Sequence, residues 1–203
     1  MRQQEMRIFS YVVARDYGFA PNPFHGFCTL ATCKPQIRKH ANVGDYIVGI
    51  TPRDMGNKIC YVMEVGSKVS FDEYWEGEQY QAKKPRLNMS YKYSFGDNIY
   101  HRKSDGTWHQ ENSHHTNEDG SPIQENIDAD TGTTDNVLIG SNFSYWGKDA
   151  VDLPPEFNAL IVARAHKCEF SREFVDSFLV WYRGQIKGQI STPERWTKRG
   201  TFI

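Results

Sequence analysis

Cys33 is a candidate nucleophile because of its neighbours in the sequence. Lys34 follows it, and Pro35 suits the first turn of a short helix that runs to Ala41. A helix N-terminus and a neighbouring lysine both make a thiol lose its proton more readily. With a histidine as base, such a thiol forms a nucleophile–base pair. The candidate bases and acids in this region are Asp16, His25, His40 and Asp45, and spacing alone does not say which lies near the thiol.

The same helix start is a candidate phosphate site. Backbone amides at a helix N-terminus attract anions, and the helix dipole adds to that attraction. Lys34 and Arg38 are four residues apart, so they share one side of the predicted helix. The alternative is a short amphipathic helix whose basic side chains are solvated.

Two aromatic segments are candidates for the walls of a pocket that holds a flat heterocycle. The first is the 16–34 loop, where Pro21 and Pro23 stiffen a chain that carries Tyr17, Phe19, Phe24 and Phe27. Asn22 and His25 offer polar groups for the edge of such a ligand. The alternative is a loop whose rings fill the edge of the core.

The second aromatic segment is "GSNFSYWG", residues 140–147. If it faces the first segment, its rings would close a cage around a nucleobase. Core packing is again the alternative. The candidate ligand-binding residues in this segment are Ser141, Asn142, Phe143, Tyr145 and Trp146.

Metal and cofactor motifs are absent from the sequence. His101, His109, His114 and His115 lie in a polar region without a helical frame or cysteine partners, so we predict no metal site there. The four cysteines lack the spacing of a zinc ribbon, and we expect reduced thiols. No nucleotide-binding glycine loop, metalloprotease motif or deaminase motif occurs, and we predict no cofactor.

Charge is distributed unevenly along the chain. The net charge of −1 argues against a general nucleic-acid binder. However, no lysine or arginine occurs between Ser104 and Gly147, and that stretch holds eight acidic residues. The remainder carries 24 basic against 17 acidic residues, a balance that can attract a phosphate-bearing partner. We therefore interpret residues 104–135 as a polar, acidic insertion.

The elements that must position these residues follow from hydrophobic patterns and turn signals. Ser70 and Glu73 predict a capping box at the start of a short helix, and Ser171 predicts the start of a long one. Residues 111–135 read as a mobile loop. We expect strands at 7–14, 46–50, 58–69, 136–147 and 158–170, a hairpin at 98–110, and helices at 35–41, 70–77 and 172–185. The sum is an α+β fold with a curved, mainly antiparallel sheet and short helices.

No apolar run approaches the roughly 20 residues that a membrane-spanning helix requires. The first ten residues lack the apolar core of a signal peptide, and Met6 is a candidate natural start. We expect a cytoplasmic protein.

The stretch from Met6 to Gly49, "MRIFSYVVARDYGFAPNPFHGFCTLATCKPQIRKHANVGDYIVG", resembles the type-two nucleotide-modification-associated domain. That family comprises phage and bacterial proteins found near DNA base-modification or anti-phage genes. The likeness continues more loosely through "VLIGSNFSYWG" and "FVDSFLVWYRGQ". It implies a single domain over residues 6–203 and a nucleotide context, without implying a particular reaction.

A weaker likeness is to the EVE, ASCH and YTH group of PUA-like barrels, carried by "IRKHANVGDYIVGI". It implies a PUA-like curved β-barrel that binds a modified base in an aromatic cage. By position, Asn22 and His25 would read the base edge, and Lys34 and Arg38 would contact phosphate. The acidic insertion disfavours a long duplex and favours a small nucleotide or a flipped-out or single-stranded base. The stacking residues implied are Phe24, Phe143, Tyr145 and Trp146.

Three functions remain open from the sequence. The first hypothesis is a non-catalytic domain that binds a nucleotide or modified nucleobase in a DNA-modification or phage-defence context. The second is an enzyme, a group transferase or hydrolase, acting on nucleotides or modified DNA bases. The third is an accessory protein whose exposed rings bind a protein partner.

Overall fold

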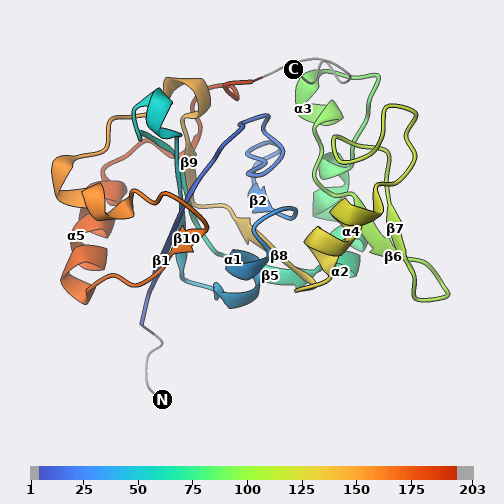
Figure 1. Cartoon of the computed structure of the whole chain (residues 1–203), viewed down its shortest axis with the longest axis horizontal. Coiled ribbons are helices and arrows are strands. Elements are labelled where there is room, and N and C mark those ends of the chain that lie inside the picture. Colours follow the sequence, from blue (N-terminus) through green and yellow to red (C-terminus); the bar gives the residue numbers. More distant parts are fainter. Residues whose placement is uncertain (1–4, 196–203) are drawn as a thin grey trace.

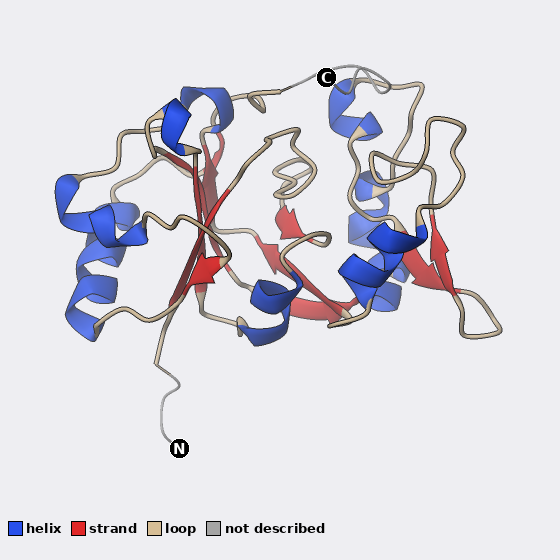
Figure 2. Ribbon diagram, viewed as in Figure 1, coloured by secondary structure: helices blue, strands red, loops and turns tan. Residues whose placement is uncertain are grey.

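The computed structural model of the chain describes residues 5–195. Two β-sheets lie side by side in the middle of the molecule, and most helices lie beyond them at the two ends of the long axis (Figures 1 and 2). A small β-hairpin lies at the end opposite the long helix α5 (Arg172–Arg183). This mixed α+β architecture agrees with the class predicted from the sequence.

The larger sheet has six strands in the order β10-β1-β3-β4-β9-β11. Its first strand, "IFSYV", is β-branched or aromatic at most positions, and four of its five residues are buried. The pairs β1–β3 and β9–β11 are parallel, whereas the remaining pairs are antiparallel. The strands are β1 (Ile8–Val12), β3 (Tyr46–Ile50), β4 (Ile59–Glu64), β9 (Phe143–Tyr145), β10 (His166–Lys167) and β11 (Gly188–Gln189).

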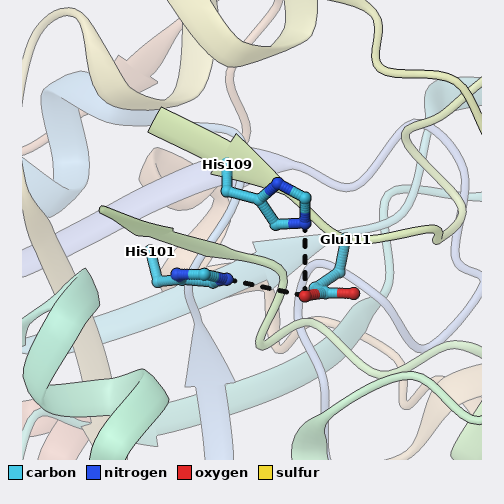
Figure 3. A group of neighbouring side chains, drawn as sticks. All are labelled: His101, His109 and Glu111. Carbon is cyan, nitrogen blue, oxygen red and sulfur yellow. Dashed lines mark ion pairs between the residues drawn. The ribbon is translucent and has the colours of Figure 1, made fainter. Parts of the chain in front are cut away.

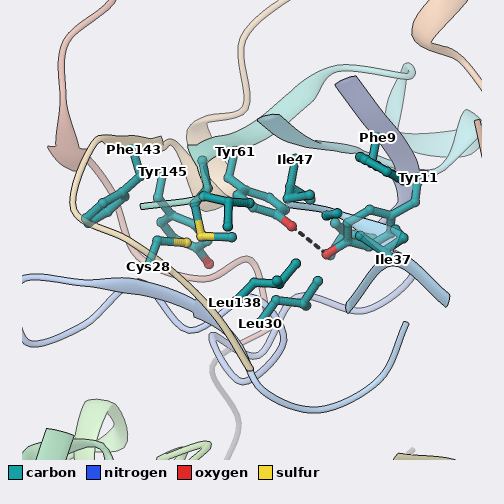
Figure 4. Packing of buried hydrophobic residues seen from close by; sticks show 14 of the residues in the cluster. Phe9, Tyr11, Cys28, Leu30, Ile37, Ile47, Tyr61, Leu138, Phe143 and Tyr145 are labelled. Atoms are coloured by element: carbon teal, nitrogen blue, oxygen red, sulfur yellow. Dashed lines mark hydrogen bonds between the residues drawn. The ribbon is translucent and has the colours of Figure 1, made fainter. Parts of the chain in front are cut away.

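The second sheet is antiparallel, in the order β2-β8-β5, and packs against one face of the first. It consists of β2 (Cys28–Leu30), β8 (Asn136–Gly140) and β5 (Ser67–Ser70). The shared core contains rings and aliphatic side chains from both sheets (Figure 4). Within it, the hydroxyls of Tyr11 and Tyr61 hydrogen-bond at 2.9 Å, which satisfies two buried polar groups.

Helix α5 (Arg172–Arg183) covers the opposite face of the six-stranded sheet, together with the 3₁₀ helix η4 (Pro155–Leu160). Ser171 caps α5 by accepting a hydrogen bond from the amide of Phe174, as predicted. The buried residues Val175, Phe178, Leu179 and Tyr182 have the spacing of one helical face. Helix α5 therefore covers the face of the six-stranded sheet that points away from the second sheet.

The three-stranded sheet is covered on its other side by short elements, which form a third core cluster with it. The predicted capping box is confirmed: Ser70 and Glu73 exchange hydrogen bonds at the start of α2. These covering elements are α2 (Phe71–Glu76), α3 (Tyr91–Ser94), α4 (Gln124–Thr131), η2 (Glu78–Lys83), and the hairpin of β6 (Tyr100–Arg102) and β7 (Trp108–Gln110). Of the remaining short elements, α1 (Pro35–His40) packs on the first cluster, η1 (Arg53–Met55) follows β3, and η3 (Gly147–Asp149) follows β9.

Two predicted strands each divide between the two sheets. Residues 58–69 form β4 and then β5, and residues 136–147 form β8 and then β9. The two segments cross closely where they pass from one sheet to the other. There, a Cβ on Gly140 would lie 2.3 Å from the carbonyl oxygen of Glu64. Only glycine fits such a crossing. The apolar pattern runs through both corners, so the sequence does not reveal the change of sheet.

Three other predictions need correction. The sheets do not close into a PUA-like barrel within residues 5–195, because β10 and β11 are open edges. Residues 158–170 contain the end of η4 and the two-residue strand β10 instead of one long strand. The predicted mobile loop at 111–135 contains α4, whose Ile127 is buried in the third core cluster.

Among residues 5–195, no helix has both the length and the apolar character needed to cross a membrane.

Candidate functional site

Cys33 lies in the tight connection between β2 and α1. Its φ of 58° and the φ of 41° at Lys34 place two consecutive residues in the left-handed region. Such backbone is costly for residues with side chains and is concentrated at functional sites. The amide of Cys33 donates to Asp130 Oδ1 at 2.6 Å, which fixes this turn against α4. The thiol is partly exposed.

His115 and Asp130 complete a row of three functional groups with Cys33. The Sγ of Cys33 lies 3.9 Å from Nε2 of His115. The other ring nitrogen, Nδ1, lies 3.0 Å from Oδ2 of Asp130. Asp130 is almost fully buried, and the His115 side chain is 17% exposed. We call these three residues the Cys33 site.

Several buried side chains hold Asp130 and His115 in place. Tyr100 donates its hydroxyl to Asp130 Oδ2 at 3.0 Å. Gln110 donates to the Tyr100 hydroxyl at 3.0 Å and to the His115 carbonyl at 3.2 Å. Asn126 donates to the same carbonyl at 2.8 Å. The carboxylate and imidazole are therefore oriented by the hairpin and by α4, as a preorganised site requires.

The protonation of His115 follows from these contacts. Burial alone would lower the pKa of the imidazole. Its hydrogen bonds to Asp130 and Cys33, together with their charges, outweigh burial and raise the pKa of His115 from 6.5 to about 9. Near neutral pH the histidine is therefore an imidazolium, and an imidazolium favours the thiolate of a neighbouring cysteine.

The arrangement has the parts of a nucleophilic centre. A thiolate attacks an electrophilic carbon, an adjacent imidazolium returns a proton to the leaving group, and a buried carboxylate orients the ring. Sequence separation is large, since Cys33 is 82 residues from His115 and 97 from Asp130.

A family model described as nucleotide modification associated domain 2 matches residues 5–200. The chain belongs to that family. The match includes all three residues of the Cys33 site and confirms the resemblance seen in the sequence. A search of curated proteins and a search of solved structures each found no match. The nucleotide modification associated domain 2 family thus supplies the general context of nucleotide modification.

In this family member the two predicted aromatic segments do meet. The hydroxyl of Tyr145 donates to the carboxylate of Asp16, with oxygen distances of 2.7 and 2.6 Å. The rings, however, do not line an open cage. Phe24, Phe143, Tyr145 and Trp146 are each at most 5% exposed.

The buried rings also divide between different parts of the core. Phe143 and Tyr145 pack between the sheets, while Trp146 packs on the α5 side. Tyr17 belongs to the third cluster and stacks on Phe95 with ring centroids 5.9 Å apart. The core-packing alternative therefore describes these rings better than a base-binding cage.

The predicted phosphate clamp also needs correction. Arg38 is fully buried, and its guanidinium donates to the backbone carbonyls of Cys33, Asp130 and Asn136. It is a structural residue that ties α1 to β8 and α4. Lys34 is partly exposed, and its ammonium lies 4.8 Å from the ring centroid of Tyr11. Because Lys34 follows Cys33 directly in the chain and Arg38 is buried, Lys34 remains the candidate basic side chain near the thiol.

The polar residues predicted to read a base edge serve other purposes. Asn22 is fully buried and donates to the Phe95 carbonyl at 3.0 Å. His25 packs against Tyr93, with ring centroids 4.6 Å apart and ring planes tilted by 42°. At the second segment, Ser141 is exposed, and the exposed Asn142 donates to Glu64 at 2.7 Å.

The base of the Cys33 site was not among the bases predicted for the thiol. His40, one of the predicted bases, has its Nδ1 2.9 Å from the Gln36 carbonyl within its own helix. His115 stood out in the sequence only as part of a histidine-rich stretch, and Asp130 only as one acid of the insertion. The signal available in the sequence was that the segment read as a loop carried two histidines and the apolar residues Ile123 and Ile127, four positions apart.

Proposed function

We propose that this chain is a cysteine-dependent enzyme acting on a nucleotide or a modified nucleobase, with Cys33 as nucleophile. The observation that carries the proposal is the row of atoms from Cys33 Sγ through the His115 ring to Asp130, with distances of 3.9 and 3.0 Å. The sulfur–nitrogen distance is long for a hydrogen bond. Such contacts commonly tighten only when substrate binds.

The roles follow from charge and burial. Cys33 attacks as a thiolate, paired with the imidazolium of His115, whose pKa of about 9 keeps it protonated near neutral pH. His115 then donates that proton to the leaving group. Asp130 orients the imidazole, and the group bound to the sulfur passes to water or to another acceptor. These alternatives correspond to a hydrolase and a group transferase.

The family supports the choice of substrate class, since its description associates the domain with nucleotide modification. Charge supports it as well. Lys34 lies next to the nucleophile, and the chain outside residues 104–135 carries 24 basic against 17 acidic residues. Both features favour a ligand that bears phosphate. A phage or bacterial DNA-modification or defence setting is part of the same proposal.

Thiol reactivity tests the catalytic part of the proposal without a known substrate. Cys28 and Cys60 are buried, so replacing the partly exposed Cys168 by serine leaves Cys33 as the accessible thiol of the described residues. We expect iodoacetamide to modify Cys33, because the imidazolium of His115 lies 3.9 Å from its sulfur. His115→Gln should slow that reaction roughly tenfold or more at pH 6.

The matched control is His40→Gln, which removes an exposed histidine from α1 and should leave the rate unchanged. Mass spectrometry of the intact chain and of its peptides would give the rate at Cys33. The proposal fails if the His115→Gln rate equals the parent rate at pH 6.

Protection from alkylation tests the substrate class. We expect a nucleotide or an oligonucleotide with a modified base to slow modification of Cys33 at millimolar concentration. A binder without chemistry would also protect the thiol, but only an enzyme loses product formation on Cys33→Ser while keeping its affinity. If no member of a broad nucleotide and modified-base panel protects Cys33, the substrate part of the proposal is wrong.

A further inference from the structure

Three possible metal ligands converge on the outer face of the β6–β7 hairpin. His101 in β6 pairs directly with His109 in β7, so both side chains leave the hairpin on the same face. Glu111 follows two residues later on that face, and its amide continues the pairing by donating to the Ile99 carbonyl at 2.8 Å. Figure 3 shows both imidazoles pointing at one carboxylate oxygen of Glu111. We call these residues the hairpin site.

The spacing of the three donor atoms suits a small metal ion. Nε2 of His109 lies 3.3 Å from Oε1 of Glu111, and Nε2 of His101 lies 3.5 Å from the same atom. All three donors lie within 4.8 Å of one another. Zinc bonds of about 2.0–2.1 Å in a tetrahedral site separate neighbouring ligand atoms by about 3.3 Å. Small side-chain rotations would therefore bring all three donors onto one ion.

The contacts of His101 orient its Nε2 towards the position between the three donor atoms. Its Nδ1 lies 3.3 Å from the carbonyl oxygen of Arg102. A carbonyl only accepts hydrogen bonds, so this contact places the hydrogen on Nδ1 and leaves the lone pair on Nε2. The ring also stacks on Trp75, with centroids 4.2 Å apart and planes 20° from parallel. A hydrogen bond from the second ring nitrogen to a backbone carbonyl is typical of metal-binding histidines, and the stacked ring restricts rotation of the imidazole.

We infer that His101, His109 and Glu111 bind a divalent transition-metal ion, and the donor set of two imidazoles and a carboxylate suits Zn²⁺. The three side chains are 20–36% exposed, so water or an external ligand can take the remaining coordination position. The competing explanation is a carboxylate paired with protonated histidines. That arrangement would give no saturable affinity for zinc.

Metal at this site would stabilise the hairpin that holds the Cys33 site. Side chains alternate along a strand, so Tyr100 and Gln110 leave the hairpin on the face opposite the metal ligands. These two residues hold Asp130 and the His115 carbonyl. A metal bridging the two strands would therefore restrain the side chains that orient the catalytic acid and base.

Isothermal titration of the full, chelator-treated chain with ZnCl₂ at pH 7.5 tests the inference. We expect one saturable site per chain that persists in Cys33→Ser, which excludes binding at the thiol. Loss of an outer-shell partner alone costs roughly 10–100-fold in metal affinity. We therefore expect His109→Ala or Glu111→Gln to weaken zinc binding by at least that factor.

His40→Ala is the matched control, since it removes an exposed histidine outside the hairpin and should leave the affinity unchanged. Circular dichroism of each variant would establish that it is folded. If His109→Ala does not fold, Glu111→Gln still tests the site, because it preserves the size of the side chain. The inference is overturned if the parent chain shows no saturable zinc binding, or if neither hairpin variant weakens it. Alkylation of Cys33 is a separate measurement, so failure here leaves the proposed function intact.

Discussion

His115 couples folding to acid–base chemistry in a single residue. Its pKa in the folded chain is about 9, against 6.5 for an unperturbed histidine, because its contacts with Asp130 and Cys33 outweigh burial. A group whose pKa is raised on folding binds its proton more tightly in the native state. The native state is therefore favoured wherever the proton is bound.

This shift predicts a pH-dependent contribution to stability. The contribution of His115 should be fully present below about pH 6.5 and should disappear as pH rises through about 9. A shift of this size corresponds to a stabilisation on the order of 3 kcal/mol. Urea unfolding of the parent and of His115→Gln between pH 6 and pH 10 should give free energies that converge with rising pH. A difference that stays constant over that range would contradict the assignment.

Among the elements, α2 offers the sharpest test of a local sequence signal. Ser70 accepts from the Glu73 amide at 3.1 Å, and Glu73 accepts from the Ser70 amide at 2.7 Å. Replacing a serine cap by alanine typically costs about 1 kcal/mol. We expect Ser70→Ala to lower the free energy of unfolding by that amount, measured by urea denaturation.

Ser90 provides the matched control for α2. It occupies the same position before α3 but makes no side-chain capping bond. Ser90→Ala should therefore leave the free energy of unfolding almost unchanged. Equal losses in the two variants would mean that the hydrogen bonds of the capping box contribute nothing specific.

Elements were predictable where local chemistry decides them. The capping box at Ser70, the cap at Ser171 and the hairpin tip near Gly106 depend on residues within a few positions of one another. The change of sheet near Gly66 and Gly140 depends on which distant strand is adjacent, and the apolar pattern is continuous there. The strand predicted at 158–170 was wrong for a similar reason. Leu160 is buried, but it lies at the end of a 3₁₀ helix that packs against α5.

The Cys33 site is formed by tertiary contacts between segments that are far apart in the sequence. The sequence alone could therefore predict only part of it. Cys33 was recognisable from its immediate neighbours, Lys34 and Pro35. Its partners His115 and Asp130 reach it only because the insertion folds back and places α4 against α1. No spacing rule covers a separation of 82 or 97 residues. Arg38 was misassigned for the same reason, because its burial is a tertiary property.

A buried ammonium also links distant parts of the molecule. Lys83 is fully buried and donates to Asn22, Phe27 and Thr29 at 2.7–3.1 Å, while Thr29 donates to the buried Asp97 at 2.6 Å. Burial lowers the pKa of Lys83 to about 8, even though the charge of Asp97 acts in the opposite direction. This network fastens the loop before β2 to the segment that follows α2.

Removing the ammonium should therefore destabilise the whole chain. Lys83→Met leaves Asp97 and several buried oxygens without the cation, and such losses typically cost about 3–5 kcal/mol. Lys92→Met, at an exposed position in α3, is the control and should change stability little. Chemical denaturation followed by tryptophan fluorescence would compare them. Similar stabilities for the two variants would show that the network is dispensable.

The long separation between Cys33 and its partners has a consequence for biosynthesis. A nascent chain carries Cys33 well before the ribosome has added His115 and Asp130. Until those residues emerge and α4 docks, the cysteine lacks the imidazolium that would activate it. An unfinished or truncated polypeptide would thus expose only an ordinary, slowly reacting sulfhydryl, and reactivity would appear as a late product of maturation.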